Sequence, residues 1–100
     1  MTSLKVIAPN ADTASRLEGD ILSTVYQKLA EFNFEPVGTV AAAGHGNVFA
    51  LNPTGDVVME TENNVVTVKV RHADLDEKDL FISVLADLEE RNDGVTGEID

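Results

Sequence analysis

The first candidate for a catalytic or ligand-binding residue is a histidine between two glycines. His45 lies in the segment 43–47, whose sequence is AGHGN. Glycines let backbone N–H groups approach a ligand, and histidine can act as an acid, a base or a metal ligand. A tight turn explains the same residues, because turns need the backbone freedom of glycine. The segment matches neither a P-loop nor a dinucleotide-binding pattern, so we favour the turn.

A second candidate gathers side chains of metal-ligand type. His72 is followed by Asp74, Asp76 and Asp79, and a hard cation could use the carboxylates. The spacing does not fit a calcium loop, since Lys78 stands where an oxygen donor is expected. Helix capping and the helix dipole explain the acids equally well. We therefore predict no metal site and no cofactor.

Paired carboxylates form the third candidate. Glu60 and Glu62 are two residues apart, so in a strand they share a face, and such a pair can do acid–base work in a cleft. Lys69 and Arg71 on the next predicted strand can neutralise them. Three serines lie in predicted helices without a nucleophile-elbow motif: Ser15, Ser23 and Ser83. The sequence thus contains no convincing catalytic set, and we predict that the protein is not an enzyme.

Charge limits the classes of partner. Asp and Glu outnumber Lys and Arg by 18 to 7, which gives a formal net charge of −11. Nucleic acids and anionic membranes are bound by basic surfaces, so we predict neither as a partner. Many acids with few lysines are also typical of proteins from salt-accumulating halophiles. The acidity therefore has two explanations, salt adaptation or a charged surface directed at a partner.

Length and composition predict one domain. The chain has 100 residues, 43% of them hydrophobic, and no cysteine, so a core is feasible without disulfides. We assign the domain to residues 1–91 and a flexible acidic tail to 92–100. The N-terminus does not read as a signal peptide, and no apolar run is long enough to cross a bilayer. We expect a cytoplasmic protein.

Two segments have the periodicity of amphipathic helices. The first covers about 12–32 and the second about 74–91. Asp74 can cap the second helix. The first has two candidate caps and one interior glycine, which either weakens the helix or lets a neighbour approach closely: Asp12, Thr13 and Gly19.

Between the helices, turn residues divide the chain into a meander over 37–71. The predicted strands lie near 37–43, 47–52, 56–62 and 65–71, and a further strand at 4–8 is expected at an edge. This pattern predicts an α+β fold, with a four- to five-stranded, mainly antiparallel sheet and both helices packed on one face.

The turns also predict which residues pair. The Asn63–Asn64 turn, where asparagine tolerates positive φ, sets Met59 opposite Val68. The turn at 52–55 sets Phe49 opposite Met59, and the turn at 44–47 sets Ala42 opposite Phe49. One face then collects nine apolar residues: Val40, Ala42, Phe49, Leu51, Val57, Met59, Val66, Val68 and Val70.

The other face of the predicted sheet is where we expect function. One end is small and apolar and the other carries charges of both signs, whereas a solvated face usually alternates more cleanly. We predict an interaction face made of seven residues: Thr39, Ala41, Ala43, Val48, Ala50, Val58 and Val65.

These observations favour a small acidic, non-enzymatic protein-interaction module. We expect it to form a homodimer or bind a protein partner through the second sheet face or an edge strand. The order of elements over about 12–91 is similar in outline to small acidic secretion-type chaperones, which implies an adaptor or chaperone-like role. Two alternatives remain open. One is a ligand-binding domain or enzyme that uses the His45 loop or the His72, Asp74 and Asp76 cluster, and the other is a viral or cellular structural subunit.

Overall fold

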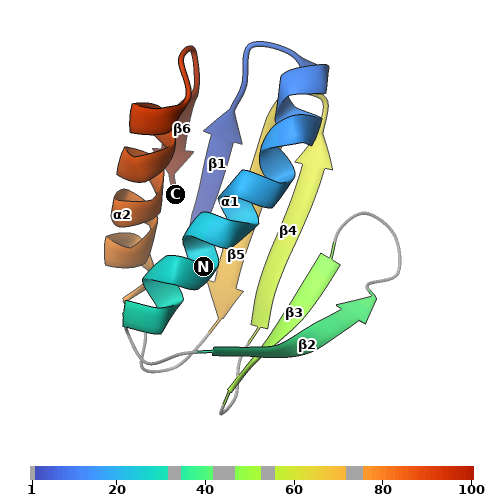
Figure 1. Cartoon of the computed structure of the whole chain (residues 1–100), viewed down its shortest axis with the longest axis vertical. Helices are drawn as coiled ribbons and strands as arrows, with labels where there is room; N and C mark the ends of the chain where they lie inside the picture. The colour runs from blue at the N-terminus through green and yellow to red at the C-terminus, as the bar shows by residue number, and fades with distance from the viewer. Residues whose placement is uncertain (1, 32–34, 42–46, 53–55, 72–75) are drawn as a thin grey trace.

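The computed structural model describes residues 2–31, 35–41, 47–52, 56–71 and 76–100, with side chains described in 2–31, 57–71 and 76–100. Its elements are β1 (Ser3–Ile7), α1 (Ala11–Glu31), β2 (Glu35–Ala41), β3 (Asn47–Asn52), β4 (Asp56–Glu62), β5 (Val65–Arg71), α2 (Glu77–Arg91) and β6 (Thr96–Ile99). The strands form one sheet in the order β2-β3-β4-β5-β1-β6, and each neighbouring pair is antiparallel. Both helices pack on one face of it (Figure 1). The predicted α+β class is confirmed.

The N-terminal strand is internal, which corrects the predicted edge position. β1 lies between β5 and β6 and is antiparallel to both. Its alternate residues Leu4 and Val6 are fully buried, and they pair with the buried Val68 and Val66 of β5. The helical layer covers this apolar side, and strands on both edges satisfy the backbone N–H and C=O groups of β1.

The segment predicted as a flexible tail instead contributes a strand. Thr96–Ile99 forms β6 on the outer side of β1, and Asp100 exchanges backbone hydrogen bonds with Ser3 at 3.0 and 3.2 Å. Val95 is buried in the core. The acidic residues of this segment gave no strand pattern in the sequence, although Thr96–Ile99 pairs with β1.

The β4–β5 hairpin has the predicted register. Met59 pairs with Val68, and Glu62 pairs with Val65. Asn63 has a φ of 54°, the left-handed conformation that the turn requires. Asn64 then ties the turn to the end of β1, because its side-chain amide donates to the carbonyl oxygen of Ala8 at 2.9 Å.

The other two hairpin registers differ from the prediction. Phe49 pairs with Val57 rather than Met59, a shift of two residues that leaves the alternation of the strand unchanged. In the first hairpin, Phe49 pairs with Thr39 rather than Ala42. That shift of three residues is odd, and it accompanies an irregularity between Pro36 and Gly38. Proline lacks the N–H that a ladder needs, so a bulge is expected there.

Both helices begin at caps other than the predicted ones. Asn10 caps α1 by accepting a hydrogen bond from the backbone N–H of Thr13 at 2.8 Å. Asp76 caps α2 by accepting from the N–H of Asp79 at 3.2 Å. Asp74, the predicted cap, lies outside the described residues.

The core fills the space between the helices and one face of the sheet. Most apolar residues of both described helices are buried, as are the predicted core residues of β4 and β5. At position 97, α2 and the sheet are in close contact, since a Cβ there would lie 3.0 Å from the Lys5 backbone oxygen and would collide with the side chain of Leu85. The largest fully buried side chains are Phe81, Leu4, Ile21, Leu29, Leu80 and Leu88.

Candidate interaction surface

The side of the sheet that faces away from the helices carries the candidate site, and we call it the open face. Strand alternation places its residues, because they alternate along each strand with the residues that face the helices. Four of them are aliphatic or hydroxyl side chains that stay only partly exposed without any helix above them. Among the described side chains, the open face comprises Lys5 and Ile7 on β1, Val58, Glu60 and Glu62 on β4, Val65, Thr67, Lys69 and Arg71 on β5, and Thr96 and Glu98 on β6 with the neighbouring Asp100.

Opposite charges occupy opposite ends of this face. Glu62 and Glu60 lie on β4 next to the β4–β5 turn, and they pair with Val65 and Thr67. Lys69 lies one step further from the turn, because it pairs with Val58. Both glutamates and Lys69 are exposed. We call the end at the turn, with Glu60 and Glu62 beside Lys5, the acidic end of the face. We call the end with Lys69 and Arg71, where Arg71 pairs in the ladder with Asp56, the basic end.

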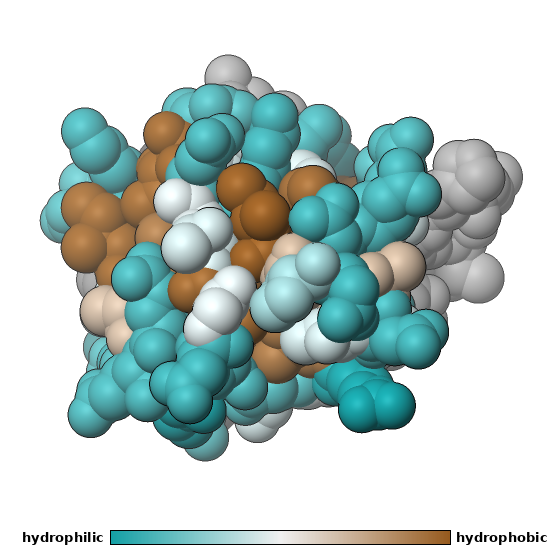
Figure 2. Space-filling model, turned by 90° about the horizontal axis from the view of Figure 1, so that it is seen from above, coloured by the Kyte–Doolittle hydropathy of each residue, from teal (hydrophilic) through white to brown (hydrophobic). Residues whose placement is uncertain are grey.

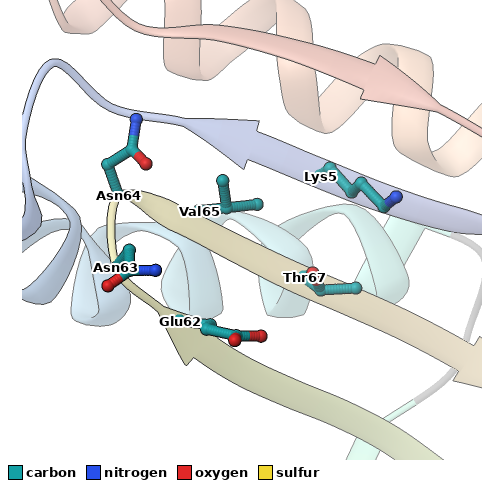
Figure 3. A pocket seen from close by; sticks show the side chains of 6 residues that line it. All are labelled: Lys5, Glu62, Asn63, Asn64, Val65 and Thr67. Atoms are coloured by element: carbon teal, nitrogen blue, oxygen red, sulfur yellow. The ribbon is translucent and has the colours of Figure 1, made fainter.

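A hollow of about 330 Å³ opens at the acidic end. Lys5, Glu62, Asn63, Asn64, Val65 and Thr67 line it (Figure 3). Val65 and Thr67 form part of its floor on β5, with Lys5 on β1 to one side and Glu62 on β4 to the other. A second hollow of about 20 Å³ lies beside it, among Val58, Glu60, Thr67 and Lys69, and has room for little more than one water molecule.

The polar groups of the larger hollow are not equally available. The Lys5 Nζ lies 3.3 Å from a carboxylate oxygen of Asp100, and the Asn64 amide is bound to the Ala8 carbonyl. Among the described side chains no cation pairs with Glu62 within 4 Å. With Lys5 balanced by Asp100, Glu62 leaves the hollow with an excess negative charge, so it favours a cationic group.

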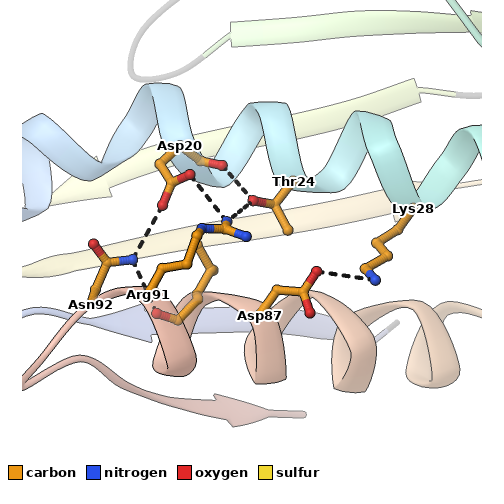
Figure 4. A network of polar contacts seen from close by, with 7 residues as sticks. Asp20, Thr24, Lys28, Asp87, Arg91 and Asn92 are labelled. Atoms are coloured by element: carbon orange, nitrogen blue, oxygen red, sulfur yellow. Dashed lines mark hydrogen bonds and ion pairs between the residues drawn. The ribbon is translucent and has the colours of Figure 1, made fainter.

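The helical layer holds a separate polar network between α1 and α2 (Figure 4). The Arg91 guanidinium lies 3.1 Å from the Asp20 carboxylate and donates to the buried Thr24 hydroxyl. Asn92 donates to the other Asp20 oxygen at 3.2 Å. This network fixes the end of α2 from which the chain enters β6, and its role is structural.

Tyr26 has the one resolved pKa shift among the described residues. Burial raises the pKa of its hydroxyl above the ordinary value of 10.0 by desolvating the phenolate. Tyr26 belongs to α1 and packs against the core, so this shift reports packing in the helical layer and lies away from the open face.

The predicted interaction face is only partly assembled. Val58 and Val65 lie on the open face, and Val48 pairs with Val58 in the sheet. Thr39, however, pairs with Phe49, and Ala41 pairs with Asn47. Both positions are therefore out of step with Val48 and Ala50 in the pleat. The odd shift of the first hairpin causes this separation, and Ala43 lies outside the described residues.

The candidates for catalysis or metal binding do not form a site in the described part of the chain. His45, His72 and Asp74 lie outside it, and Asp76 serves as a helix cap. In the same part no three Asp, Glu or His side chains gather as a metal-binding group. Among the described helices, none is both long enough and apolar enough to span a membrane.

Sequence reasoning missed the contribution of β1 to the open face. Lys5 and Ile7 belong to it because β1 pairs with β5. The alternation of Leu4, Lys5 and Val6 in the sequence indicated a strand, but nothing local indicated which strands lie next to it. Comparison with family models, curated proteins and solved structures found no match to this chain.

Proposed function

We propose that this chain is a small, non-enzymatic protein-interaction module that self-associates through the open face of its sheet. The observation that carries the proposal is the uncovered sheet itself. Both helices pack on the opposite side, which leaves Ile7, Val58 and Val65 partly exposed in the middle of charged residues. A partner that covers them would remove apolar surface from water.

Charge supports the same surface. Among the described side chains, the open face carries three bases and four acids, so the rest of the sequence holds 7 − 3 = 4 bases and 18 − 4 = 14 acids. Most of the negative charge therefore lies away from the open face, and two copies that bring other acidic surfaces together repel each other. The open face is closer to neutral than the rest of the sequence taken together.

The edges of the sheet offer another way for copies to pair. Seen from the end of the molecule that carries the β4–β5 turn, hydrophobic residues gather toward the middle and one side, with hydrophilic residues around them (Figure 2). The edges of the sheet are β2 and β6, and association through an edge strand remains the second way in which copies could pair. An adaptor or chaperone-like role would use the same surface toward another protein.

Sedimentation of the full chain over a range of concentrations tests the proposal. We expect a concentration-dependent dimer that Val58→Lys converts to a monomer, because a lysine in the middle of the face would have to be buried on association. Ile82→Lys is the matched control, since Ile82 is 50% exposed on α2 and the substitution changes the charge equally. A wild-type chain that stays monomeric at high concentration would refute the proposal, and loss of the dimer in the control alone would place the interface on α2.

A further inference from the structure

We infer that two copies pair about a twofold axis that lies between their open faces and crosses the strands, with Glu60 and Glu62 of one copy against Lys69 of the other. This inference rests on the proposed function and adds the geometry of the contact. It commits to a second copy of this chain as the occupant of the hollow at the acidic end.

The arrangement of charge along the strands selects this axis. Glu60 and Glu62 lie toward the turn and Lys69 lies away from it. A twofold axis across the strands reverses one copy end for end, so each acidic end meets a basic end and the contact forms twice. An axis parallel to the strands would instead place acidic end on acidic end and repeat the repulsion twice.

The hollow offers a place for the incoming lysine. Its volume of about 330 Å³ and its lining by Glu62, Val65 and Thr67 suit a side chain with an apolar stem and a cationic tip. The stem would lie over Val65 while the ammonium group meets the Glu62 carboxylate. Lys5 does not compete for that carboxylate, because it is held 3.3 Å from Asp100.

Charge reversal at two positions tests the geometry. Lys69→Glu and Glu62→Lys each turn two attractive contacts into repulsive ones, so each variant alone should dimerise about tenfold or more weakly than the wild type. An equimolar mixture of the two variants should recover the dimer, because both contacts then join unlike charges. The chain carrying both substitutions should recover it as well. Sedimentation measures association, and far-UV circular dichroism checks that each variant is folded.

The matched control reverses a charge on the helical layer. Lys78→Glu changes the net charge as Lys69→Glu does, at an exposed site on α2, and should leave the dimer unchanged. A wild-type dimer that neither single reversal weakens would overturn the geometry and leave self-association standing. Loss of the dimer in both single variants without recovery in the mixture would also overturn it. A monomeric wild type would overturn the proposed function together with this inference.

Discussion

Two glycines, Gly19 in α1 and Gly97 in β6, have opposite effects on packing. Gly19 lies in the exposed middle of α1, and a Cβ built on it would meet no atom within 4 Å. Gly97 lies in β6 opposite Val6, where a Cβ would come 3.0 Å from the Lys5 backbone oxygen. The sequence allowed two interpretations of Gly19, a weak point in the helix or a site of close approach. The structure supports the first. The close approach occurs at Gly97, in the segment predicted to be a tail.

The same substitution at these two positions should therefore change stability in opposite directions. Gly19→Ala should raise the free energy of unfolding by up to about 1 kcal/mol, because alanine favours the helix and restricts the unfolded chain. Gly97→Ala should lower it by about 1–3 kcal/mol, since the added methyl group must displace Leu85 or the backbone. Urea denaturation of the two variants measures both. A Gly97→Ala variant as stable as the wild type would contradict the close packing of α2 on β6.

The caps mark a limit of sequence reasoning at the residue scale. Asn10, Asp12 and Thr13 all prefer a helix N-terminus, as do Asp74 and Asp76. Preference alone does not rank neighbours of equal quality. Tertiary packing sets the residue at which each helix begins. That residue determines which of these side chains accepts a hydrogen bond from the free backbone N–H three residues later. The turn at Asn63 was predictable because few residues accept its positive φ.

At the scale of elements, the two helices are held by polar contacts as well as by the core. Thr24 is only 1% exposed, and its hydroxyl donates to the Asp20 carbonyl at 2.7 Å while it accepts from Arg91. The Arg91–Asp20 ion pair is partly exposed, with side-chain exposures of 43% and 37%, so the pair alone contributes little. We expect the hydrogen bond from Arg91 to the buried Thr24 hydroxyl to contribute more to stability than the ion pair with Asp20.

Arg91→Met should lower the free energy of unfolding by about 1 kcal/mol, because the Thr24 hydroxyl loses one of its two hydrogen bonds. The methylene stem is retained, so the packing of α2 changes little. Arg16→Met serves as the control, since Arg16 is exposed on α1 and should change stability by a few tenths of a kcal/mol at most. Thermal and urea unfolding measure the difference. Equal stability of the two variants would show that the network does not stabilise the helix pair.

Strand pairing separates what local signals specify from what they leave open. The β4–β5 register followed from one two-residue turn and a clear apolar alternation. The β2–β3 register did not, because Pro36 lies beside an irregularity that shifts the strand by an odd number of residues. An odd shift moves each residue of a strand to the opposite face of the sheet. For this reason Thr39 and Ala41 do not share a face with the other residues of the predicted interaction face.

At the scale of the whole molecule, charge is the dominant feature. A net charge of −11 on 100 residues produces self-repulsion that destabilises the compact state. The described ion pairs, Lys5–Asp100, Lys28–Asp87 and Arg91–Asp20, offset only part of it. At molar salt the Debye length is about 3 Å, so repulsion between exposed charges that lie farther apart is largely screened.

We expect the melting temperature to rise from dilute buffer to molar KCl. Replacing Glu89 and Glu90 on α2 by glutamine should raise it in dilute buffer and reduce the gain from salt, because both side chains are exposed and repel their acidic neighbours. Replacing Ser23, which is exposed on α1, by asparagine is the uncharged control. A melting temperature independent of KCl in the wild type would mean that net repulsion does not limit stability, and would remove the argument for salt adaptation.

From the sequence we could predict the class of the fold, both helices and the β4–β5 hairpin. These depend on contacts between neighbours along the chain, where a period of 3.6 or 2 and a turn residue are sufficient. Tertiary structure alone decided that β1 lies between β5 and β6, that the acidic end of the chain forms a strand, and which charges meet on the open face. Such pairings join residues far apart in sequence, and their free energy depends on surfaces that exist only once the remainder of the chain has packed.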